Sequence, residues 1–100
     1  MTINETQNDT TMIFQIEGRL DTNTAPQLEA RIRDSLQTCK KLILDLHAVE
    51  YISSSGLRVV LLAHKLMEGI GGKMSVKSPS EFCKQVLVAT GMESVLSVIS

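Results

Sequence analysis

The amino-acid sequence predicts an α/β fold: a single domain over residues 1–100, built from a mixed sheet of four to five strands with helices packed on it. Short segments with the apolar patterning of strands alternate with longer segments whose apolar residues recur at helical spacing. The connections between them are short, and right-handed strand–helix–strand crossovers would make part of the sheet parallel. Hydrophobic residues make up 43% of the chain and charged residues 21%, a balance that supports one packed core at this length.

The N-terminal third is expected to hold two strands and a helix. Residues 11–17 alternate apolar and polar side chains, the period of a half-buried strand, and residues 2–7 form a shorter partner. Gly18 breaks this pattern. A first helix should begin after Thr24, because residues 24–27 resemble a capping box with a proline in the first turn. The apolar stripe of this helix comprises Leu28, Ile32 and Leu36.

The middle of the chain predicts a strand, a loop, a long helix and another strand. Residues 42–46 are a short continuous apolar run, which is typical of a central strand covered on both faces. A loop over residues 51–55 leads into a helix from Gly56 to about Gly69, whose apolar side chains cover more than one stripe. Residues 73–77 form the next strand.

The C-terminal quarter predicts a third helix. Ser78 is its expected N-cap, because a proline and then a glutamate at the third position follow it, and Gly91 ends it. Residues 95–99 form a last short strand or a final apolar turn. The third helix should turn inward Phe82, Val86 and Leu87.

Composition argues against several classes of function. Ten Lys and Arg residues stand against eleven Asp and Glu, with three aromatic residues, so we expect no nucleic-acid binding. No apolar run is long enough for membrane insertion and the N-terminus is not a signal peptide, so a cytoplasmic protein is expected. Cys39 and Cys83 are expected to be reduced thiols, and neither they nor His47 and His64 have metal-ligand spacing, so no metal or cofactor is expected.

Three consecutive serines, Ser53 to Ser55, precede the second helix. Backbone N–H groups at a helix start are unpaired and the helix dipole there favours negative charge, so a phosphate ester on one of these serines would be accommodated. The alternative is that the serines only cap the helix. A serine hydrolase is not expected, because the loop lacks a Gly-x-Ser-x-Gly elbow, and the chain is therefore not expected to be an enzyme.

The segment 44–59 has the pattern Leu-Asp-Leu-x-x-Val-x-Tyr-Ile-x-Ser-Ser-Gly-Leu-x-Val, which resembles the signature of the STAS domain family. Residues 17–21, 71–74 and 90–92 also resemble features of that family, so that the resemblance covers essentially the whole chain. Free-standing members of this length resemble bacterial anti-sigma factor antagonists.

The resemblance implies a STAS-like domain that works by partner switching. The unphosphorylated antagonist would bind an anti-sigma factor that is also a serine kinase and so free a sigma factor. Phosphorylation of Ser54 would block binding until a phosphatase restores it, with Ser53 and Ser55 as alternative acceptors. Many members have an aspartate where this chain has Ser53. The implied partner-binding residues are Asp21, Ser53, Ser54, Ser55, Gly56, Leu57 and Arg58.

Three alternatives stay open on the sequence. Asp21 either shapes the docking surface or only stabilises its own turn. Arg58 either faces the partner or is only a solvated arginine. The whole domain could instead be a non-switching STAS accessory subunit of a membrane transport or signalling complex, since a fold does not decide a function.

Overall fold

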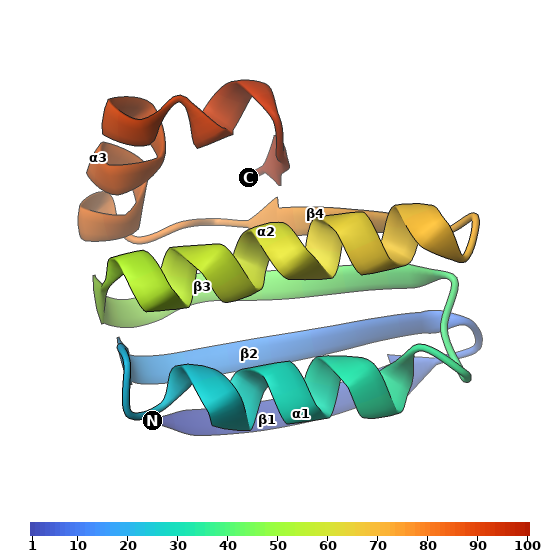
Figure 1. Ribbon diagram of the computed structural model, residues 1–100. Coiled ribbons are helices and arrows are strands. Elements are labelled where there is room, and N and C mark those ends of the chain that lie inside the picture. Colours follow the sequence, from blue (N-terminus) through green and yellow to red (C-terminus); the bar gives the residue numbers. More distant parts are fainter.

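The computed structural model describes all residues, 1–100, as a five-stranded sheet with three α-helices (Figure 1). The sheet is mixed, and its strands follow in the order β1-β2-β3-β4-β5. β1 is antiparallel to β2, whereas β2, β3, β4 and β5 run parallel to one another. The predicted α/β class and mixed sheet are therefore confirmed. The strands are β1 (Thr2–Asn8), β2 (Thr11–Leu20), β3 (Lys41–Ile52), β4 (Lys73–Lys77) and β5 (Ser97–Ile99).

The helices α1 (Ala25–Ser35) and α2 (Ser54–Gly69) lie side by side over one face of the sheet (Figure 1). Their buried side chains and the buried side of the strands form one core, which is mainly aliphatic and contains Phe14. α3 (Glu81–Thr90) packs at the end of β3, and a short 3₁₀ helix, Met92–Ser94, leads from it into β5. The chain's last expected element is thus a strand rather than an apolar turn.

β3 is longer than predicted and is covered differently. Leu42, Leu44 and Leu46 are buried under the helices, but Ile43 and Asp45 on the opposite side are only half-buried. The prediction that this strand is covered on both faces is therefore wrong, because α1 and α2 occupy a single face.

The strands β2 and β3 also continue past their predicted ends. Gly18 does not end β2 but lies inside it with φ of 96°, a left-handed value that suits glycine. Two register shifts, after Gln15 and after Gly18, absorb extra residues of β3 and let Leu20 pair with Ile52. The carboxyl ends of β2 and β3 consequently meet at one edge of the sheet.

Both predicted capping arrangements need correction. Thr24 is the N-cap of α1, but its hydroxyl makes no capping bond to the helix. The N-cap of α3 is Ser80, whose hydroxyl accepts from the Cys83 N–H, whereas Ser78 lies outside the helix in a left-handed conformation. The inward direction of Phe82 is also wrong, since Cys83 and Leu87 are the buried residues of that helix.

Candidate functional site

The three serines occupy three different environments at the start of α2. The helix begins at Ser54 and not at Gly56, because Ser53 is the N-cap and accepts a hydrogen bond from the Gly56 N–H at 3.2 Å. The Ser55 hydroxyl lies 3.1 Å from the Thr22 hydroxyl, a contact that joins two loops. Ser54 is exposed, and its hydroxyl has no hydrogen-bond partner within the chain. The structure thereby separates one free hydroxyl from two engaged ones.

Ser53 also explains why a serine can stand at a position where an aspartate is common in the resembled family. Serine and aspartate are about equally good N-caps, since both offer an oxygen to the first free N–H groups of a helix. The extended backbone of Ser53 (φ −91°, ψ 175°) is the conformation that such a cap requires. Ser53 therefore keeps the capping function and removes one negative charge beside Ser54.

Gly56 brings the helix start close to the end of β2. A Cβ atom at this position would lie 2.5 Å from the Leu20 carbonyl oxygen, and that oxygen already accepts the Ser53 N–H at 3.0 Å. Close approach of backbone to backbone is thus the reason for glycine here, rather than a left-handed φ. The serine loop is held firmly against the strand edge as a result.

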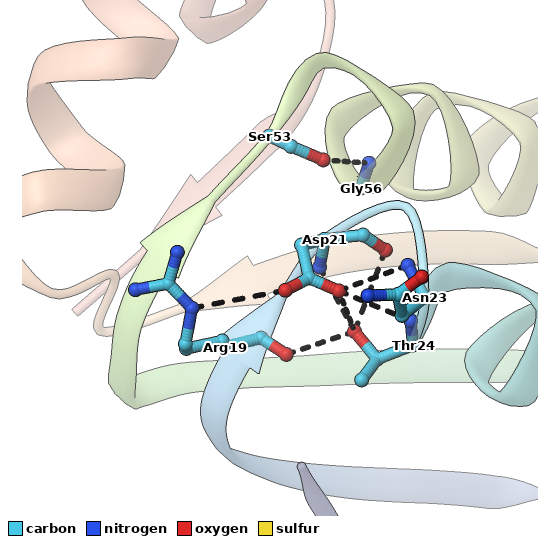
Figure 2. Close-up of polar contacts among 6 residues, drawn as sticks. All are labelled: Arg19, Asp21, Asn23, Thr24, Ser53 and Gly56. Carbon is cyan, nitrogen blue, oxygen red and sulfur yellow. Dashed lines mark hydrogen bonds and ion pairs between the residues drawn. The ribbon is translucent and has the colours of Figure 1, made fainter.

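The turn between β2 and α1 lies beside this loop and is organised by Asp21 (Figure 2). One oxygen of the Asp21 carboxylate accepts from the backbone N–H groups of Asn23, at 3.0 Å, and Thr24, at 3.2 Å. The Thr24 hydroxyl accepts from the Asp21 N–H and donates to the Arg19 carbonyl, both at 2.8 Å. Because the Thr24 hydroxyl makes these two bonds, it does not cap α1 as the sequence predicted.

The electrostatics of Asp21 follow from the same contacts. Burial alone would raise the pKa of this carboxyl, but the N–H groups of Asn23 and Thr24, the Thr24 hydroxyl and the Arg19 charge outweigh it and lower the pKa. Asp21 has a turn-stabilising role in this structure, and no hydrogen bond joins it to the serines.

A hollow of about 420 Å³ opens between α1 and α2 next to the serine loop. Arg58 lines it together with the hydroxyl-bearing residues Thr22 and Ser55. The other arginines of the chain each pair with a carboxylate, whereas Arg58 has no such partner. The floor and walls of this hollow are formed by Ala25, Pro26, Glu29, Val59 and Leu62.

The structure thus brings most of the expected partner-binding residues to one edge of the sheet. Ser54 and Arg58 are exposed there, while Leu57 is half-buried and Gly56 is buried. Sequence reasoning missed Thr22, because nothing local links it to a serine 33 positions away. A larger hollow of about 600 Å³, between α3, the 3₁₀ helix and β5, contains none of the expected site residues.

The cysteines and the possible metal ligands form no second site in the structure. Cys39 and Cys83 are free and buried, and burial raises the pKa of the Cys83 thiol although the neighbouring Ser80 opposes this shift. No group of His, Cys, Asp and Glu side chains gathers where it could hold a metal ion. None of the helices is both long and apolar enough to span a membrane.

Known proteins similar to this chain share its sequence pattern along almost the whole length. Residues 2–100 match the STAS domain. BtrV of Bordetella bronchiseptica RB50 is 31% identical over 91 residues, which span 90% of this chain and 78% of that protein. The anti-sigma F factor antagonist of Paenibacillus polymyxa is 26% identical over 89 residues, which span 87% of this chain and 76% of that protein.

Solved structures share the fold. TM1081 of Thermotoga maritima superposes with a TM-score of 0.90 at 24% identity, covering 98% of this chain and 86% of that one. The Bacillus cell fate determinant SpoIIAA in its phosphorylated form gives a TM-score of 0.79 at 19% identity, covering 99% of this chain and 92% of that one. A sulfate transporter family protein from Wolinella succinogenes gives a TM-score of 0.78 at 20% identity, covering 90% of this chain and 76% of that one. With its match over residues 2–100 and the five-stranded sheet described above, this chain belongs to the STAS domain family.

Proposed function

We propose that this chain is an anti-sigma factor antagonist that switches partners through phosphorylation of Ser54. The role rests on relatives that carry this name, including the anti-sigma-B factor antagonist of Bacillus subtilis at 25% identity over 92% of this chain. In the proposed cycle, the unphosphorylated chain binds an anti-sigma factor with serine kinase activity and frees a sigma factor. Phosphorylation of Ser54 ends that binding, and a phosphatase restores it.

The observation that carries the choice of Ser54 is its free, exposed hydroxyl. A kinase must reach the hydroxyl oxygen, and Ser54 offers it without breaking any hydrogen bond in the chain. Phosphorylation of Ser53 would remove the cap of α2, and phosphorylation of Ser55 would break its contact with Thr22. Ser54, the first residue of α2, is therefore the acceptor whose phosphorylation disturbs the fold least.

A phosphate at this place would act through charge. A phosphate adds a charge of about −1.5 to −2 at the surface. The whole chain has a net formal charge of only −1, so the change is large in comparison. The partner would lose contact with an uncharged serine and meet a hydrated dianion, whose desolvation and repulsion disfavour binding. The unpaired Arg58, one helical turn further on, is within reach of the same phosphate at i, i+4 spacing.

The test is a pull-down from the host lysate with wild type, Ser54→Ala and Ser54→Asp, read by mass spectrometry with phosphosite mapping. Wild type and Ser54→Ala should retain a small ATP-binding kinase, and Ser54→Asp should lose it. Ser94→Asp is the matched control, because it adds the same charge at an exposed serine of the 3₁₀ helix, and it should retain the kinase.

Recovery of the same membrane transporter by all four proteins, with no phosphate on Ser54, would instead support the non-switching accessory subunit. This alternative is included in the test because a sulfate transporter family protein shares the fold.

A further inference from the structure

Three side chains form a stack at the edge of the sheet that carries the serine loop. Arg19 and Tyr51 are paired neighbours on β2 and β3, and the Arg19 guanidinium carbon lies 4.3 Å from the centre of the Tyr51 ring. Phe82, the second residue of α3, continues the stack with its ring centre 5.2 Å from that of Tyr51 and its plane inclined by 43°. The stack therefore joins the ends of two strands to the start of a helix.

Core packing does not account for this stack. The Arg19 side chain is 59% exposed and Phe82 is 38% exposed. α3 is fastened to the body of the protein by its buried residues Cys83 and Leu87, which point elsewhere than Phe82. Exposed Phe82 and Arg19 thus flank a half-buried Tyr51 at the surface, and Tyr and Arg are residue types enriched in the energetic centres of protein interfaces.

Arg19 is held ready to receive an acidic partner. Its Nε atom lies 3.7 Å from Asp21, whose other oxygen is already bonded to the turn, and its two terminal nitrogens point away from that carboxylate (Figure 2). Stacking on Tyr51 favours this orientation of the guanidinium, so that less side-chain freedom is lost on binding than for an unstacked arginine. A planar pair of free N–H donors fits a carboxylate in a bidentate manner.

We propose that the anti-sigma factor also docks on the Arg19–Tyr51–Phe82 stack, through a carboxylate next to an apolar side chain. The carboxylate meets the terminal nitrogens of Arg19, and the apolar side chain covers the exposed ring of Phe82. This inference rests on the proposed function and extends its surface beyond Ser54, to residues that do not change on phosphorylation. The stack contributes to the affinity for the anti-sigma factor, while Ser54 decides when it is released.

The test measures dissociation constants of purified variants for the kinase that wild type retains, by isothermal titration calorimetry. Phe82→Ala should weaken binding about tenfold or more, as expected for an aromatic centre of an interface. Arg19→Gln and Arg19→Lys should both weaken it to a similar extent, because lysine keeps the charge but lacks the planar fork. Val88→Ala is the matched control, an apolar residue of the same helix that is 59% exposed and outside the stack, and it should bind like wild type.

The outcomes separate this inference from the proposed function. If Ser54→Asp releases the kinase but Phe82→Ala and Arg19→Gln bind it like wild type, the stack is not a docking surface and the switch stands. If Ser54→Asp still binds while the stack variants lose affinity, the switch is wrong and the docking surface stands. Should Phe82→Ala unfold, Arg19→Gln decides alone, because it changes only an exposed side chain.

Discussion

Replacing Gly56 with alanine tests whether close backbone approach holds the serine loop in place. The added methyl carbon would lie 2.5 Å from the Leu20 carbonyl oxygen, 2.8 Å from the Leu20 Cγ and 3.1 Å from the Ile52 Cγ1. The carbonyl cannot yield easily, because it accepts the Ser53 N–H at 3.0 Å. The start of α2 must therefore move away from β2.

The cost follows from two opposing effects. Overpacking of this kind destabilises by about 1–3 kcal/mol, and contact with backbone favours the upper end. Alanine regains up to about 1 kcal/mol of helix propensity over glycine. We expect Gly56→Ala to lower the free energy of unfolding by about 2 kcal/mol, which is roughly 8–16 °C in Tm for a chain of this size.

Gly69→Ala is the control on the same helix. A methyl group there meets nothing within 4 Å, and Gly69 has no left-handed φ, so at this last residue of the helix the same substitution should leave the stability unchanged or raise it by up to about 0.5 kcal/mol. Urea unfolding followed by far-ultraviolet circular dichroism, which reports the helix content, measures both. Equal stability of Gly56→Ala and wild type would refute the role assigned to close approach.

The remaining predictions concern the cap and the neighbouring turn. Ser53→Ala should lower the free energy of unfolding by about 1 kcal/mol, because the N-cap of α2 is lost. Ser54→Ala loses no hydrogen bond and should leave the free energy of unfolding nearly unchanged in the same urea assay. Equal losses in the two variants would contradict the assignment of Ser53 as the cap. For Asp21, whose folded pKa is lowered below its ordinary 3.8, the stabilisation is present above that value and disappears as the pH falls through the folded pKa. Wild type should therefore lose more stability than Asp21→Asn between about pH 5 and pH 2, and parallel acid titrations of the two would show the reasoning to be wrong.

Much of the fold was predictable because local patterns decide it. The alternation of Met12, Phe14 and Ile16 placed β2, and the apolar stripe through Leu28 and Ile32 placed the buried side of α1. These residues could be assigned because the side-chain periods of strands and helices differ and can be read along the chain. Element ends were the weak point, as the extension of β3 to Ile52 shows.

Two of the errors arise from competition between local and distant partners. Thr24 had the sequence of a cap, but the Arg19 carbonyl and the Asp21 N–H took its hydroxyl. Phe82 had the spacing of a core residue, but Cys83 and Leu87 are the residues that α3 buries, and the Phe82 ring packs on Tyr51 of another element instead. Local pattern cannot decide such cases, because the competing group belongs to a different part of the chain.

The sequence by itself determined the class of fold, the family resemblance and the position of the serines before a helix, since each depends on residues close together in the chain. Only the tertiary structure decided which serine is free. Ser53 is engaged by the Gly56 N–H once the helix forms, and Ser55 by Thr22 once β2 and β3 end at the same edge of the sheet. Ser54 is left exposed because the fold supplies partners to both of its neighbours and none to its own hydroxyl.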